Sequence, residues 1–197
     1  MRHALLAAAL IAAPATVMAE GFSYSYLDAR YFSTDTDAVS VNQQGGALSG
    51  SFALTPMFYV AADGSYGKSE KVAVGTATGS FETISGSARL GAHYPITEVL
   101  DVLANAGALY GEVKGKGAFN GESEDDIGYV GEVGLRLALI PKLEVGAFYN
   151  YQDIFSDSTS AFTAELQYHV VEKFTVVGSA VSGRNADVYT IGGRYHF

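Results

Sequence analysis

The chain has 197 residues and a formal net charge of −9, from 21 acidic and 12 basic residues. This acidic balance argues against a nucleic-acid partner, because binding to phosphates needs clustered lysine and arginine. Cysteine is absent from the sequence, which excludes disulfide bonds, thiolate metal sites and a cysteine nucleophile.

The first 19 residues have the pattern of a secretory signal peptide. Arg2 and His3 give a charged start, residues 4–13 form an apolar run, and small residues lead up to Ala19. The apolar run is too short to cross a bilayer as a helix, and a buried N-terminal helix is the alternative. The sequence predicts cleavage after Ala19 and a single mature domain over residues 20–197.

After this leader, apolar and polar side chains alternate along successive stretches, as they do in strands whose two faces meet different surroundings. The predicted strands span residues 21–32, 45–54, 57–66, 80–94, 99–112, 127–140, 143–152, 160–170, 173–182 and 187–197. Short turns near Pro56, Pro95, Pro141 and Val171 join alternate pairs of strands. Longer polar loops join the others, over residues 33–44, 67–79, 113–126, 153–159 and 183–186.

Short turns on one side and longer loops on the other are typical of outer-membrane barrels. The pattern therefore predicts an all-β fold, a closed antiparallel transmembrane up-and-down β-barrel of about ten strands, with eight strands as the alternative. Closure is expected because an unpaired strand edge facing lipid would leave backbone donors and acceptors without partners. An even number of strands places both termini on the periplasmic side.

Aromatic residues gather at the ends of the predicted strands. The periplasmic set is Phe22, Tyr24, Phe58, Tyr94, Tyr168, Phe174, Tyr195 and Phe197. The opposite set is Tyr31, Tyr66, Tyr110, Tyr129, Tyr149, Tyr151, Phe162 and Tyr189. Two such bands are expected where a barrel crosses both interfaces of a membrane.

The polar faces of the strands carry charged residues that should face the barrel lumen. The candidate lumen charges are Arg30, Asp63, Arg89, Glu132, Arg136, Glu165 and Arg194. The wider inward set adds Asp28, His93, Asp101, Glu144, His169 and His196. In a narrow lumen, acids and bases pair and fill the space. The alternative is a thin conductive path lined by the same charges.

No motif for catalysis or for a cofactor stands out, since the spacings GxSxG, HExxH and the P-loop are all missing from the sequence. We therefore expect no enzyme activity, no cofactor, and neither catalytic residues nor metal ligands. The acidic run at residues 122–126 lacks the ligand order of an EF-hand, so a solvated charge run is favoured. Contact with lipopolysaccharide through bridging cations is the alternative for that run.

The last stretch ends on Phe197, with Tyr195 two residues earlier on the same face. This ending resembles the C-terminal signature of bacterial outer-membrane barrels, which implies recognition by the barrel assembly machinery. Together with the leader and the alternating strands, it makes the chain similar to small barrels of the OmpA/OmpX-like kind. Its hairpins (LTPMF, HYPIT, LIPKL) are also similar to a family of short cysteine-free barrels discussed as secreted signalling or immune-elicitor proteins.

The resemblance departs from OmpA and OmpX in strand number, ten against eight, and in having no peptidoglycan-binding domain after the barrel. It implies an integral protein of the bacterial outer membrane with a structural or surface-interaction role, in which loops are presented outside. The alternatives are a narrow passive pore for small solutes or ions, and a soluble periplasmic or secreted binding barrel. The expected partners are outer-membrane lipid or lipopolysaccharide and the assembly machinery, while the sequence does not identify an extracellular partner.

Overall fold

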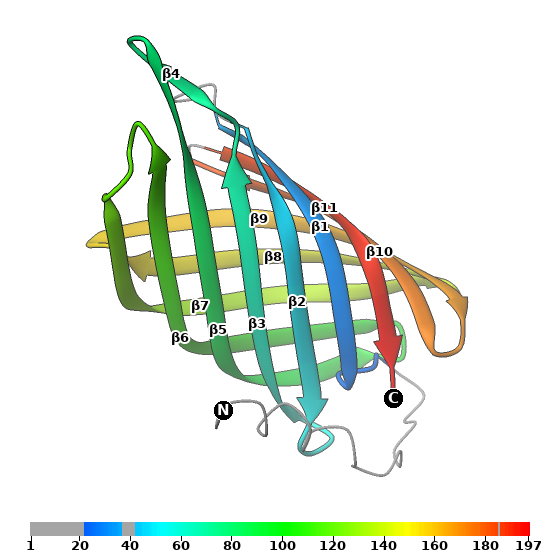
Figure 1. Ribbon diagram of the computed structural model, residues 1–197. Coiled ribbons are helices and arrows are strands. Elements are labelled where there is room, and N and C mark those ends of the chain that lie inside the picture. Colours follow the sequence, from blue (N-terminus) through cyan, green and yellow to red (C-terminus); the bar gives the residue numbers. More distant parts are fainter. Residues whose placement is uncertain (1–21, 37–41, 185) are drawn as a thin grey trace, which may run out of the picture.

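Antiparallel strands account for most of the chain in the computed structural model, which describes residues 22–36, 42–184 and 186–197 (Figure 1). The strands are β1 (Tyr26–Thr36), β2 (Gln43–Ala53), β3 (Phe58–Ser69), β4 (Val72–Val74), β5 (Ala77–Thr97), β6 (Leu100–Gly117), β7 (Ser123–Ile140), β8 (Leu143–Ile154), β9 (Asp157–Val171), β10 (Phe174–Gly183) and β11 (Ala186–His196). Within these ranges no helix is long and apolar enough to span a membrane. The predicted leader lies outside the described residues.

The sheet closes on itself because its first and last strands pair. β1 and β11 run antiparallel along their whole lengths, from Tyr26 opposite His196 to Thr36 opposite Ala186. The three-residue β4 pairs only with the start of β5, and β3 pairs directly with β5. Ten strands therefore form the wall, which confirms the predicted closed barrel and decides against eight strands.

The wall has two different ends. The turns at residues 54–57, 98–99, 141–142 and 172–173 lie at one end, which also holds the C-terminus (Figure 1). We call this the turn end. The opposite end, the hairpin end, carries the junctions around residues 70–76 and 118–122, and β4 and the long strands β5 to β7 project from it (Figure 1).

Apolar and polar residues are arranged inside out relative to a soluble protein. Leu48, Leu90 and Ile191 expose 68%, 59% and 62% of their surface on the outer wall. Among the described residues, four hydrophobic side chains are buried, against eleven polar or charged ones. A wall that exposes its apolar side chains suits lipid, whereas a soluble binding barrel would require the reverse arrangement.

The aromatic bands follow the prediction at most positions. The outward residues near the turn end include Phe58, Tyr94 and Tyr168, which are 49%, 59% and 48% exposed. Phe22 and Tyr24 were wrongly assigned to this band. They precede β1, and Tyr24 is only 6% exposed because its ring lies inside the barrel.

Several strands continue further than the alternation predicted. The predicted loop at residues 113–126 is mostly strand, since Lys114 lies opposite Ser123 and only residues 118–122 form the turn. The predicted loop at residues 153–159 shrinks to a turn at Phe155 and Ser156, whose φ angles are +56° and +58°. Backbone pairing extends the ladder beyond the lipid, where no apolar face remains to mark the strand in the sequence.

Gly107 on β6 allows a close approach between two strands. A Cβ atom at this position would overlap the backbone carbonyl of Ala88 on β5. We expect Gly107→Ala to lower the free energy of unfolding by about 1–3 kcal/mol, because the strands would have to separate locally. Urea titration of the refolded barrel, followed by the mobility of unboiled samples in SDS-PAGE, measures the change.

Gly46→Ala is the matched control, since the nearest atom to its added Cβ is the Arg30 carbonyl oxygen at 3.8 Å. Equal unfolding curves for the two variants would contradict the close approach at Gly107.

Candidate functional site

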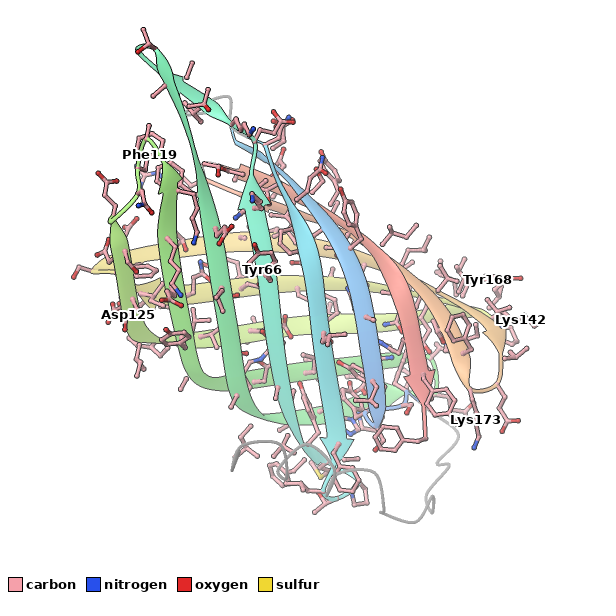
Figure 2. All side chains as sticks on the ribbon, viewed as in Figure 1. Tyr66, Phe119, Asp125, Lys142, Tyr168 and Lys173 are labelled. Atoms are coloured by element: carbon pink, nitrogen blue, oxygen red, sulfur yellow. The ribbon has the colours of Figure 1, made fainter. Side chains whose placement is uncertain are left out.

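Charged side chains from several strands meet inside the turn-end half of the lumen. Figure 2 shows the two ends between which they lie, with Phe119 and Asp125 at the hairpin end and Lys142 and Lys173 at the turn end. Three hydrogen-bonded groups fill the turn-end half, and a fourth lies nearer the middle. Together these groups decide how far the lumen is open.

The first group joins β1, β9 and β11. Asp28 accepts hydrogen bonds from the guanidinium groups of Arg30, at 2.7 Å, and Arg194, at 2.9 Å. Arg30 also donates to Glu165 at 2.8 Å, and Arg194 donates to Gln167 at 3.0 Å. Because β1 and β9 do not pair with each other, the Arg30–Glu165 ion pair crosses the interior of the barrel.

Burial makes this first group costly to disrupt. The Asp28 side chain is fully buried and that of Arg194 is 4% exposed. The Arg194 guanidinium also lies 3.9 Å from the centre of the Tyr26 ring, a distance at which a cation is attracted to the ring face. A buried carboxylate is tolerated only when paired and hydrogen-bonded, so these bonds hold three wall strands in register.

The second group joins β7 to β11 at the turn end. Arg136 donates to Glu144 at 2.6 Å, and Glu144 also lies 2.8 Å from the Nε2 atom of His169. The Oγ1 atom of Thr175 is 2.9 Å from Nδ1 of His169 and 3.0 Å from Nε2 of His196. Both histidines are therefore built into a continuous polar chain across five wall strands.

The third group contains a segment that is not part of the wall. The Tyr24 hydroxyl donates to Asp101 at 2.8 Å, and its ring stacks on His93 at 3.9 Å and on Tyr59 at 4.8 Å between ring centres. The Arg136 guanidinium lies 5.0 Å from the centre of the same ring. Sequence reasoning missed this position, although Tyr24 shares the even-numbered alternation that places Asp28 and Arg30 on the inner face.

The fourth group lies nearer the middle of the lumen. Arg89 donates to Asp63 at 2.6 Å, Ser87 donates to Asp63 at 2.5 Å, and Asn105 donates to Glu132 at 2.8 Å. The Asp63 side chain is 30% exposed and that of Arg89 is 19% exposed. Since both residues face inward, water reaches this level of the lumen.

The exposures describe a lumen that is open on one side. Asp63 is partly solvated, whereas Asp101, Gln167 and Thr175 nearer the turn end are at most 1% exposed. The lumen therefore resembles a cup, open toward the hairpin end and filled by side chains at the turn end.

The lumen charges do not balance. Between the aromatic bands, four arginines face six carboxylates, an excess of two carboxylates over arginines. The arginines are Arg30, Arg89, Arg136 and Arg194, and the carboxylates are Asp28, Asp63, Asp101, Glu132, Glu144 and Glu165. Cations are therefore favoured over anions in any water that occupies the lumen.

One residue of the acidic run at the hairpin end, Asp126, has a structural role. Asp126 accepts hydrogen bonds from the backbone N–H groups of Ile127, at 2.8 Å, and Phe155, at 2.7 Å. It therefore holds the turn between β8 and β9. Across the described residues, no group of three or more histidine, aspartate or glutamate side chains is placed to hold a metal ion.

The C-terminal aromatic residues lie on the outer wall. Tyr195 is 48% exposed and Phe197 is 38% exposed, and the Phe197 ring stacks on Phe52 of β2 at 6.5 Å. Both residues are on the same lipid-facing side of β11 and its end, at the turn end of the barrel.

A closed ten-stranded wall with an apolar outer face, two aromatic bands and a charged interior defines a transmembrane β-barrel protein. The sequence matches the family described as "Outer membrane protein beta-barrel domain" over residues 4–197, and the chain belongs to this family. This match supports the predicted class of protein and its residence in the outer membrane. It also supports contact of the outer wall with membrane lipid.

Solved structures of outer-membrane barrels share the fold at low sequence identity. The KdgM porin is 12% identical, with a TM-score of 0.51 over 87% of this chain and 99% of that chain. The NanC porin is 10% identical, with a TM-score of 0.53 over 87% of this chain and all of that chain. The translocator domain of the autotransporter NalP from Neisseria meningitidis is 11% identical, with a TM-score of 0.52 over 90% of each chain.

No curated protein matches the sequence at a significant level. The comparisons therefore establish the family and the fold of this chain.

Arg194 tests the first group of lumen charges. We expect Arg194→Met to lower the free energy of unfolding by about 3–5 kcal/mol, because Asp28 would lose a partner while remaining buried. Adding Asp28→Asn should restore part of this loss. Urea unfolding of the refolded barrel provides the measurement.

Lys68→Met serves as the control, because the Lys68 side chain is 56% exposed and 3.4 Å from Glu82. Such an exposed pair contributes at most about 1 kcal/mol. If the two substitutions cost the same, the buried network does not stabilise the wall.

Proposed function

We propose that this protein presents its hairpin end outside the bacterial outer membrane, with both termini in the periplasm, and that it has no catalytic role. The observation that carries the proposal is the difference between the two ends. The turn end is filled by packed side chains, whereas β5, β6 and β7 continue past the aromatic band and project from the barrel (Figure 1).

The projecting tip has the charge of an interaction surface. Glu122, Glu124 and Asp125 are exposed in the turn and first residues that link β6 to β7. None of the ion pairs formed among the described residues involves them. Unpaired carboxylates on a projecting hairpin suit a partner with a basic surface.

The remaining partners are those of an integral barrel. The exposed apolar wall supports contact with outer-membrane lipid, including lipopolysaccharide on the external side. The outward positions of Tyr195 and Phe197 at the turn end support their recognition by the barrel assembly machinery from the periplasm. The lumen carboxylates bond to neighbouring arginines and histidines. This pairing supports a structural role for Arg30, Arg136, Glu165 and Arg194 over a catalytic one.

A narrow pore is the second candidate. Its support is the 30% exposure of the inward-facing Asp63 side chain, which is consistent with a hydrated lumen at that level. The packed residues around Tyr24 and Asp101 oppose conduction in this conformation.

The orientation can be tested with single cysteines, because the natural sequence has none. Asn120→Cys at the hairpin end should react with a membrane-impermeant maleimide on intact cells. Lys142→Cys at the turn end should react only after the outer membrane is permeabilised. Fluorescent labelling of the protein band reports both results, and the reverse pattern would contradict the proposed topology.

The acidic tip can be tested by neutralising Glu122, Glu124 and Asp125 together, as Gln, Gln and Asn. We expect proteoliposomes with the natural protein to bind immobilised polylysine, but not heparin, and to lose this binding when salt shortens the screening length. The neutralised variant should bind at least about tenfold more weakly.

Neutralising Lys68 and Lys71 to glutamine provides a matched control at the same end of the barrel. Equal polylysine binding by natural and tip-neutralised protein, both with an unchanged heat shift in SDS-PAGE, would exclude the tip as the contact surface.

A further inference from the structure

We propose that residues 22–25, called the stopper segment below, form a displaceable plug, and that the barrel conducts small cations when the segment leaves its seat. The segment enters the turn end of the lumen immediately before β1. The proposed cation conduction does not depend on the surface-interaction role, because the stopper segment lies at the turn end and the acidic tip lies at the hairpin end.

The stopper segment is held by few bonds and not by a sheet ladder. β1 begins at Tyr26. The bonds from the wall to the segment's backbone are Phe197 N–H to the Ser25 carbonyl and Arg136 to the Ser23 carbonyl, each at 3.3 Å. The Ser25 hydroxyl also accepts from the N–H of Ala53 at 3.1 Å. These contacts can break without unpairing any wall strand.

The segment packs into one side of the turn-end lumen, among side chains of the wall. On the side of β9 to β11, Gln167, Thr175 and Val177 are almost completely buried by neighbouring wall residues. On the side of β3, β5 and β6, Tyr24 packs with Tyr59 and Leu103 in a hydrophobic cluster. Removal of the Tyr24 ring would open the second side while the first side stays packed.

Beside this apolar cluster, the seat of Tyr24 contains polar atoms without partners, which lowers the cost of displacing the ring. The Oδ1 atom of Asp101 and the Nε atom of Arg136 are buried without a hydrogen-bond partner. Water that entered after displacement would satisfy both atoms, and each unsatisfied buried group is otherwise unfavourable. This gain offsets part of the loss of the Tyr24 hydrogen bond and of its aromatic contacts.

The opened path would favour cations. When Tyr24 leaves its seat, it exposes Asp101, which lies nearer the turn end than Asp63 and Glu132. Arg136 remains paired with Glu144 at 2.6 Å. The excess of two carboxylates over arginines in the lumen acts in the same direction.

Planar-bilayer recordings of the refolded full-length chain test this proposal. We expect the natural protein to remain mostly closed and Tyr24→Ala to raise the open probability at least about tenfold. Tyr24→Phe removes only the hydroxyl that binds Asp101, so it should fold normally and give an intermediate increase. Reversal potentials in a potassium chloride gradient should show a preference for the cation.

Phe148→Ala is the matched control. Phe148 packs against the same cluster but belongs to the wall strand β8, so its truncation should leave the seat of Tyr24 occupied and the open probability near that of the natural protein. Heat shifts in SDS-PAGE establish that every variant is folded.

A folded Tyr24 variant that conducts no more than the natural protein would overturn the stopper. If Tyr24→Ala does not fold, an unchanged open probability in Tyr24→Phe overturns it equally. Anion preference in the open state would overturn the assigned path.

Discussion

The structure depends on one constraint, which is that no backbone N–H or C=O group can remain unpaired in contact with lipid. The pairing of β1 with β11 meets this requirement because it removes the two free edges of the sheet. Closure then fixes which side of every strand faces the membrane and which faces the lumen. The exposed Leu48 and Ile191 and the buried Asp28 and Arg194 are consequences of this single closed ladder.

A closed wall of ten strands encloses more space than an eight-stranded one, and this space has to be filled or hydrated. The chain solves the problem differently at its two ends. Near the turn end, Asp28, Arg194 and Glu165 occupy one side of the lumen with bonds between wall strands. Tyr24 occupies the other side and belongs to a segment that precedes the first wall strand. Nearer the hairpin end, the Asp63 side chain is 30% exposed.

The difference between the two ends of the barrel also places the two proposed functions apart, with surface contact at the hairpin end and cation conduction controlled at the turn end. The projecting strands β5 to β7 carry exposed carboxylates such as Glu122 and Glu124 at the hairpin end, which is the end that we propose faces outward. At the turn end the lumen is occupied by packed side chains, among them Tyr24, which belongs to a segment that precedes β1 and has no ladder bonds. The solved barrels are only 10–12% identical to this chain, so the arguments for the acidic tip and for the stopper segment rest on this chain's own residues.

The sequence by itself predicted about ten strands, the membrane-facing side of the strands and the two aromatic bands, because alternation with a period of two assigns each residue to a face. The pairing of the strands decided between ten and eight. The sequence also placed Arg30, Asp63 and Arg89 among the inward charges. Only the tertiary structure decided that Arg30 meets Glu165 and that Tyr24 lies inside the barrel. Partners across a lumen depend on strand tilt, stagger and closure, which bring together residues far apart in the chain and leave no local pattern in it.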